Sequence, residues 1–199
     1  MGSGHGRQAR PEVKYQEMES RIRARLRLIT APPGAGKTTA ILAVASALRR
    51  GGFSGFYTEE MRAGGVRTGF KAVTFAGCDA VLADVSFRSG PRVGRYRVDV
   101  PQFEKVVVPS IDPNLTGADL FILDEIGKME CLSAYFVDCV RRIIAQNKTL
   151  VATVALKGGG LIAEVKKAPG VLIYGLNANN RARLPSDIVQ SLRAGNDRP

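Results

Sequence analysis

The stretch that decides the fold is Leu26-Arg27-Leu28-Ile29-Thr30-Ala31-Pro32-Pro33-Gly34-Ala35-Gly36-Lys37-Thr38-Thr39. Its first five residues read as a strand, and a helical period of apolar residues begins at Thr38 and runs to Arg50. A glycine-rich turn that joins a strand to a helix and ends in Lys-Thr is typical of a phosphate-binding loop, or P-loop. The sequence therefore predicts an α/β fold organised around this turn.

The residue types in the turn match that chemistry. Gly34 and Gly36 let backbone N–H groups curl around a phosphate, and the helix that follows directs its positive end at the anion. Lys37 would reach the β- and γ-phosphates, and the Thr38 hydroxyl would ligate Mg²⁺. The consensus GxxxxGK[ST] begins with glycine, but Ala31 stands there, which would cost about 1 kcal/mol if its backbone were left-handed. The predicted nucleotide-binding residues of the loop are Ala31, Pro32, Pro33, Gly34, Ala35, Gly36, Lys37, Thr38 and Thr39.

A second acidic element follows further along the chain. Asp119 to Asp124 is an apolar run that ends in acid, as expected of a central parallel strand. P-loop enzymes hold Mg²⁺ with a carboxylate at the end of a neighbouring strand, and Asp124 suits that role. Glu125 could then orient or deprotonate an attacking water; the plainer alternative is that both acids only cap the next helix. A cationic side chain is also expected to neutralise the negative charge of the transferred phosphoryl group. The candidates are Lys128, Arg62, Arg181, Arg67, Arg92 and Arg95.

Strand-length apolar runs alternate with helical ones through most of the chain, which indicates a parallel sheet with helices on both faces. The region from Gly55 to Val100 is richer in hairpin signals, so part of the sheet should be antiparallel. The predicted fold is a P-loop NTPase three-layer sandwich, RecA-like or kinase-like, with a mostly parallel sheet. The predicted elements are strands at Leu26–Thr30, Gly55–Thr58, Thr68–Phe75, Ala80–Val85, Arg95–Val100, Asp119–Asp124, Leu150–Leu156 and Val171–Leu176, and helices at Thr38–Arg50, after Pro101, over Leu132, Phe136, Val140 and Ile143, from Leu161 and near Pro185.

Charge and composition narrow the function further. The 199 residues carry a formal net charge of +11, and the first 27 hold seven basic groups against three acidic ones. We read residues 1–20 as a basic, flexible extension and 21–199 as the catalytic domain, with Arg21 to Leu28 alternating as a strand with one wet face. The basic stretch permits a nucleic-acid partner without requiring one.

No apolar run approaches the ~20 residues of a membrane span. The three cysteines show no zinc or disulfide spacing, so we expect reduced, mostly buried thiols in a cytoplasmic protein, with a monomer favoured.

Several segments together resemble one family, the small P-loop nucleoside-triphosphatases of archaea, thermophilic bacteria and animals, of the cancer-related nucleoside-triphosphatase type. The matching runs are Pro32 to Thr39, Gly55 to Arg62, Gly69-Phe70, Val93 to Tyr96, Val98-Asp99, Leu123 to Glu130, Asn180-Arg181 and Leu184 to Val189. The resemblance implies Mg²⁺-dependent hydrolysis of nucleoside triphosphates to diphosphates with tolerance of the base, and it makes Glu125 the general base. A nucleotide or polynucleotide kinase, and an NTP-regulated RNA- or DNA-binding protein, remain the alternatives.

Overall fold

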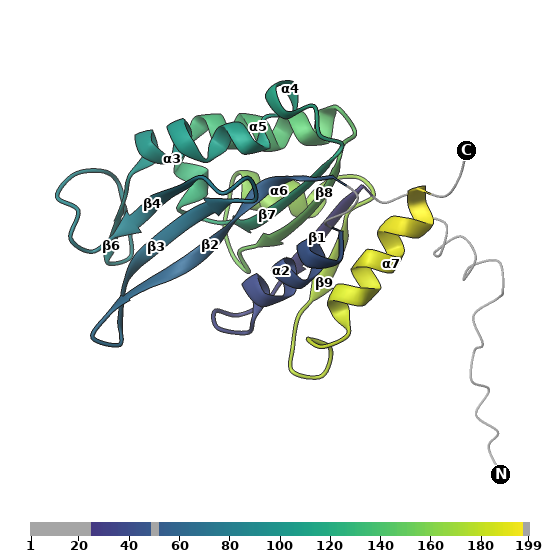
Figure 1. Cartoon of the computed structure of the whole chain (residues 1–199), viewed down its shortest axis with the longest axis horizontal. Helices are drawn as coiled ribbons and strands as arrows, with labels where there is room; N and C mark the ends of the chain where they lie inside the picture. Colours follow the sequence, from purple (N-terminus) through teal and green to yellow (C-terminus); the bar gives the residue numbers. More distant parts are fainter. Residues whose placement is uncertain (1–24, 49–51, 197–199) are drawn as a thin grey trace, which may run out of the picture.

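The computed structural model describes residues 25–48 and 52–196. Within them a nine-stranded mixed sheet has the order β5-β6-β4-β3-β2-β7-β8-β1-β9 (Figure 1). The predicted extension at residues 1–20 and the first half of the predicted strand at 21–28 lie outside the described residues. The strands are β1 Leu26–Thr30, β2 Ser54–Ala63, β3 Val66–Thr74, β4 Asp79–Asp84, β5 Arg92–Val93, β6 Tyr96–Val98, β7 Leu120–Ile126, β8 Thr149–Val154 and β9 Leu172–Gly175.

One half of the sheet is parallel and carries the P-loop. Strands β2, β7, β8, β1 and β9 pair in parallel in that order. Strand β7 is buried along nearly its whole length, as predicted for the run that ends in Asp124. It is not the direct neighbour of β1, however, because β8 lies between them. We expected the Mg²⁺-binding carboxylate on a strand next to β1, but it lies on β7, two strands away from β1.

The other half of the sheet is antiparallel and is built from hairpins. Strands β2 and β3 form a long hairpin whose turn is Gly64-Gly65, tighter than the Met61–Arg67 turn that we expected. Strand β4 pairs with β3 and β6, and β5 closes the edge against β6. The hairpin end projects beyond the body of the molecule (Figure 1).

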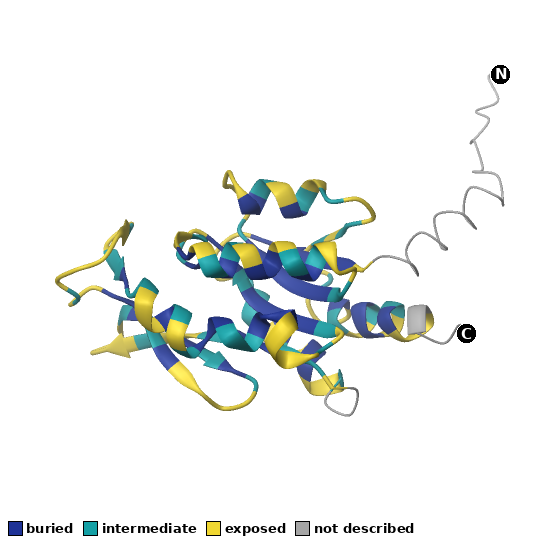
Figure 2. Cartoon of the chain, turned by 90° about the horizontal axis from the view of Figure 1, so that it is seen from above, coloured by how far each residue is buried: buried dark blue, intermediate teal, exposed yellow. Residues whose placement is uncertain are grey.

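Helices cover both faces of the sheet, which confirms the three-layer prediction (Figure 1). On one face, α2 and α7 pack over inward residues such as Ile29, Ile122 and Val151. On the other, α3, α5 and α6 pack over residues such as Leu28 and Phe121, and the sheet between the layers is buried (Figure 2). The helices are α2 Lys37–Leu48, α3 Val100–Val106, α4 Pro113–Thr116, α5 Ala134–Ala145, α6 Leu161–Lys167 and α7 Leu184–Asn196, with 3-10 turns at Val108–Ile111 and Glu130–Leu132. In the described ranges, every helix is too short or too polar to span a bilayer.

Four details differ from the sequence-based expectations. Arg27 was expected on a wet face but is only 2% exposed, because β1 is covered on both sides; its guanidinium donates to Ser191 of α7 at 2.7 Å. The sequence of Val171–Leu176 predicts a buried strand, but strand β9 is half-exposed because it forms the sheet edge. Leu132 precedes helix α5 and is exposed. The three cysteines are free thiols, and against the expectation that most are buried, Cys139 is buried, Cys131 is half-buried and Cys78 is exposed.

We expect Gly55→Ala to destabilise the protein strongly. The residue has φ +135°, and a Cβ there would lie 2.0 Å from the backbone oxygen of Ile122 on β7. Because that contact is with backbone, β2 would have to move away from β7, at a cost of about 2–4 kcal/mol of unfolding free energy. Urea unfolding measures the change. Gly175→Ala is the matched control, because nothing lies within 4 Å of its Cβ position, and equal stability of the two variants would contradict this account.

Candidate active site

The P-loop turns sharply between β1 and α2. Gly34 and Gly36 have φ values of +77° and +95°, which side chains rarely adopt, and the space beside each Cα is open. The Ala35 N–H donates to the Pro32 oxygen at 3.3 Å, and α2 begins at Lys37. Among the described residues only Asn147 is a non-glycine with positive φ, so Ala31 carries no left-handed strain. The loop therefore forms an open anion cradle at the start of a 12-residue helix.

Asp124 lies at the centre of a hydroxyl cluster beside this loop. Its side chain is almost completely buried, and its Oδ2 accepts hydrogen bonds from the hydroxyls of Thr38 at 2.7 Å and Thr58 at 3.1 Å. Its Oδ1 accepts a further bond from Thr153 at 2.5 Å. A buried carboxylate is stable only when its oxygens are satisfied in this way. The cluster brings together Thr38 and Asp124, the two residues predicted to hold Mg²⁺.

Thr58 and Thr153 were missed at the level of sequence. They lie on β2 and β8, the two strands that flank β7. Their hydroxyls reach Asp124 from both sides because the parallel strands end at the same edge of the sheet. A threonine near the end of a predicted strand was the available signal, but it acquires meaning only when the strand order is known.

Lys37 and Glu125 form an ion pair next to the cluster. Lys37 Nζ lies 3.4 Å from Glu125 Oε2 and 3.4 Å from the Ala31 backbone oxygen. Burial raises the pKa of the Glu125 carboxyl, while the charge of Lys37 opposes that shift and the charge of Asp124 adds to it. Glu125 is thus a stronger base than an exposed carboxylate, and it is held beside the residue that is expected to contact the γ-phosphate.

Glu130 is a second buried carboxyl near Glu125. It is only 5% exposed, and its Oε2 packs against Gly127, where a Cβ would come within 2.7 Å of it. Burial raises the pKa of Glu130 to about 8, opposed by hydrogen bonds from backbone N–H groups and reinforced by the charges of Glu125 and Asp124. The folded chain therefore favours the protonated form of Glu130 at neutral pH.

Because the folded-state pKa of Glu130 is raised, the stability that its neutral form contributes is complete below its ordinary pKa of 4.5 and is lost as pH rises through about 8. We therefore expect Glu130→Gln to be more stable than the parent by at least ~1 kcal/mol at about pH 9, with a smaller difference at about pH 5. Urea unfolding in EDTA measures both values. Arg141 holds the pKa of Glu164 low, so the Glu164→Gln control should show no such growth with pH, and a pH-independent difference for Glu130→Gln would contradict the prediction.

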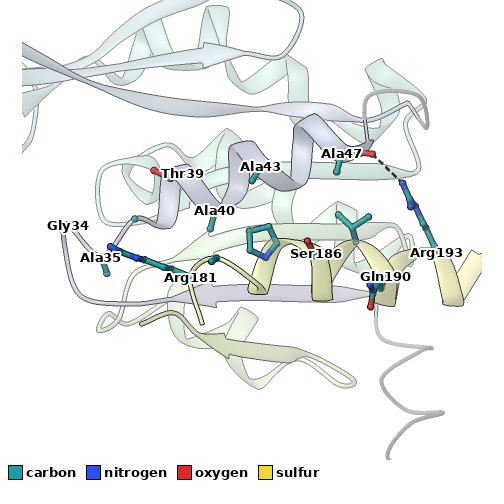
Figure 3. Close-up of a pocket in the computed structure, with 14 residues that line it drawn as sticks. Gly34, Ala35, Thr39, Ala40, Ala43, Ala47, Arg181, Ser186, Gln190 and Arg193 are labelled. Carbon is teal, nitrogen blue, oxygen red and sulfur yellow. Dashed lines mark hydrogen bonds between the residues drawn. The ribbon is translucent and has the colours of Figure 1, made fainter. Parts of the chain in front are cut away.

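A groove of about 680 Å³ runs from the P-loop between α2 and α7 (Figure 3). Its walls are mostly small or apolar, and its few polar side chains include Ser186 and Gln190. Arg181 lines the mouth, and its side chain extends toward Gly34 and Ala35 (Figure 3). At the far end Arg193 donates to the Ala47 oxygen at 3.5 Å. The apolar lining residues are Ala35, Ala40, Ala43, Ala47, Ala182, Pro185 and Val189.

Two cationic residues that were predicted to act at the site, Arg62 and Lys128, do not contact the P-loop or its neighbouring carboxylates in the described contacts. Arg62 pairs with Glu60 at 2.6 Å near the hairpin turn, four residues beyond Thr58 and so about 13 Å further along β2. The structure does not bring Arg62 to the P-loop, and we remove it from the site. Lys128 is exposed in the turn after Glu125 and stays a prediction.

Residues 27–189 match the sequence model of a family described as NTPase. This chain belongs to that NTPase family. It is 40% identical over 166 residues to the nucleoside-triphosphatase THEP1 of Thermotoga maritima, which covers 83% of this chain and 94% of that protein. It is 34% identical over 186 residues to the human cancer-related nucleoside-triphosphatase, covering 86% of this chain and 98% of the human protein.

The solved structures of this NTPase family have the same fold. The crystal structure of THEP1 from Aquifex aeolicus superposes with a TM-score of 0.74 at 35% identity, over 84% of this chain and 99% of that chain. The solution structure of the human protein gives a TM-score of 0.73 at 33% identity, over 88% of this chain and 100% of the human one. The NTPase match includes the P-loop, the Asp124 cluster, Glu125 and Arg181, while residues 1–26 precede it.

Proposed function

We propose that this chain hydrolyses nucleoside 5′-triphosphates to nucleoside diphosphates and phosphate in a Mg²⁺-dependent reaction. The observation that carries the proposal is the convergence of the P-loop Lys37 and Thr38 with Asp124 and Glu125 at one edge of the sheet. The relatives named nucleoside-triphosphatases support the same reaction.

The residues at this edge fit a magnesium ion. Mg²⁺ prefers oxygen ligands and is usually bound by one or two protein oxygens together with phosphates and water. The Asp124 carboxylate and the Thr38 hydroxyl, 2.7 Å apart, supply such oxygens. Within the described residues, no group of three or more His, Cys, Asp or Glu side chains is arranged to hold a metal ion without phosphate or water ligands. When bound, the ion would neutralise charge on the β- and γ-phosphates. Thr58 and Thr153 would keep the Asp124 carboxylate oriented through their hydrogen bonds to it.

The remaining steps belong to the chain's own groups. The P-loop backbone and the start of α2 bind the phosphates, and Lys37 leaves Glu125 to contact them because a triphosphate carries more negative charge than one carboxylate. Glu125, released from its partner, then accepts a proton from a water whose oxygen attacks the γ-phosphorus. The bond from the γ-phosphorus to the β–γ bridging oxygen breaks, and the diphosphate leaves with that oxygen. Arg181 at the mouth of the groove would hold the polyphosphate or ribose end.

The groove lining supports tolerance of the base. The apolar part of the lining includes Ala35, Ala40, Ala182 and Pro185, and its uncharged polar side chains are Thr39, Ser186 and Gln190. A pocket discriminates bases strongly only when buried polar groups would lose their partners with the wrong one. Apolar walls, two hydroxyls and one amide, each of which can both donate and accept a hydrogen bond, impose no such requirement.

The test is phosphate release from ATP, GTP, CTP and UTP, with and without Mg²⁺. We expect kcat/KM values within about tenfold of one another, because apolar contacts differ by only about 1–3 kcal/mol between similar groups. Without Mg²⁺, turnover should fall by at least about a hundredfold. Chromatography of the products separates the runner-up reaction: transfer of the γ-phosphate to a nucleoside or a 5′-hydroxyl end, in place of free phosphate, would identify a kinase. A single preferred base would overturn base tolerance but leave hydrolysis standing.

A further inference from the structure

A cluster of arginines at the projecting end of the sheet is not used by the proposed reaction. Arg62 and Arg67 are near-opposite on β2 and β3, and both pair with the single carboxylate of Glu60, at 2.6 Å and 3.3 Å. Lys71, further back on β3, is balanced separately by Glu59 and Asp79. At the hairpin end one acid therefore faces two arginines.

A third arginine joins this pair through an aromatic support. Phe70 and Tyr96 are in edge contact, with ring centroids 5.2 Å apart. Arg67 lies over the Phe70 ring at 5.4 Å, and Arg95 lies over the Tyr96 ring at 5.1 Å. Arg95 also donates to the Arg67 backbone oxygen, so β5 and β6 are tied to β3. The stacking holds both guanidinium groups in place by their faces, which leaves N–H edges for an acceptor.

The segment that carries β5 and β6 adds more positive charge. From Val85 to Val98 it contains four arginines (Arg88, Arg92, Arg95 and Arg97) and no acidic residue. Arg92 and Arg97 are directly opposite on β5 and β6, an arrangement of like charges that is unfavourable without an anion nearby. Asp84 is opposite Arg97 on β4, but its Oδ1 accepts from the N–H and hydroxyl of Ser86. Among the described residues, none of the four arginines forms an ion pair within 4.0 Å.

We propose that this end of the sheet, with the arginine platform of Arg62, Arg67, Arg88, Arg92, Arg95 and Arg97, binds the phosphate backbone of a single-stranded nucleic acid. Six arginines against Glu60 exceed the need of one phosphate and suit a chain of regularly spaced anions. Phe87, half-buried between two exposed residues, gives a base an aromatic surface to stack on. The platform lies along β2 about 13 Å beyond the Asp124 cluster. The strand thus binds beside the triphosphate site, independently of the proposed hydrolysis.

The test is binding of a fluorescein-labelled 20-nucleotide uridine strand to the full-length protein in excess Mg²⁺-ADP, which occupies the P-loop. We expect Arg67→Gln/Arg95→Gln to weaken binding by about five- to tenfold at ~50 mM salt. Its plot of log K against log salt concentration should be shallower by about 1.4, because each lost phosphate contact on a single strand is worth about 0.7. Arg67→Lys/Arg95→Lys, which keeps the charges, should recover most of the salt slope.

Two further variants separate the platform from charge and folding effects. Arg141→Gln/Arg183→Gln removes the same charge from arginines paired with Glu164 and Asp187, and should change affinity less than about twofold. Arg88→Gln/Arg92→Gln alters only exposed side chains, so it should weaken binding without lowering the melting temperature. Parental affinity and salt slope in both platform variants would overturn the proposal, as would an equal loss in the control. If a 20-residue polyglutamate competes as well as the uridine strand, the proposal of a nucleic-acid partner is overturned, and an acidic protein is the partner instead.

Discussion

Lys37→Ala should abolish phosphate release, with kcat/KM reduced by at least about a thousandfold, or roughly 4 kcal/mol of transition-state stabilisation. Lys37 is the first residue of α2, is largely buried, and is the cation held at Glu125. No other side chain in the P-loop carries charge, so its removal leaves the phosphates to the backbone N–H groups and the helix dipole alone. Steady-state phosphate release and fluorescent nucleotide binding measure the two effects, and binding should weaken as well.

Two controls sharpen the Lys37 result. Lys105→Ala removes the same charge from an exposed position on α3 and should leave turnover within about twofold of the parent. Lys37→Arg keeps the charge but replaces a compact ammonium with a larger, planar guanidinium group. Its kcat/KM should therefore still be at least about a hundredfold below that of the parent. Parental activity in Lys37→Ala would remove the loop from the mechanism altogether.

Glu125→Gln should separate binding from chemistry. The amide keeps the size of the carboxyl but cannot accept the proton of the attacking water, so we expect kcat to fall by about 10²–10⁴-fold. In the parent, an ion pair at 3.4 Å joins Lys37 to Glu125 and must break before Lys37 can contact the phosphates. The variant lacks this ion pair, so its affinity for nucleotide should be equal to or higher than that of the parent. Single-turnover hydrolysis and nucleotide titration distinguish these two outcomes.

The pH profile of the parent protein provides a second check on Glu125. Burial raises the pKa of this carboxyl, so activity should rise with pH through a midpoint above the usual carboxyl range and then level off. The Glu125→Gln variant should lack that acidic limb. Glu164→Gln, an exposed change on α6, is the control and should retain both the limb and the rate. A Glu125→Gln protein that releases phosphate at the parental rate would exclude the residue as the base.

Much of the site could be predicted because its chemistry lies in short contiguous runs. The P-loop could be predicted because its strand, turn and helix are adjacent in the chain. Strand β7 could be predicted because a buried strand that ends in an acidic residue is a local sequence pattern. Arg27 was misjudged because alternation describes one strand, whereas burial depends on what covers its two faces. Arg62 was misplaced for a related reason: a β2 longer than expected carries it away from the loop.

By itself, the sequence determined that a phosphate loop precedes a helix, that an acidic pair ends a buried strand, and that the net charge is +11. These properties reside in consecutive residues, and short-range backbone and side-chain chemistry is sufficient to read them. Only the tertiary structure decided that β8 separates β1 from β7, which places Thr58 and Thr153 on either side of Asp124. It likewise brought arginines from four strands and their connecting segments to one end of the sheet. Hydrogen bonding between strands joins residues whose separation along the chain carries no information about their distance in space.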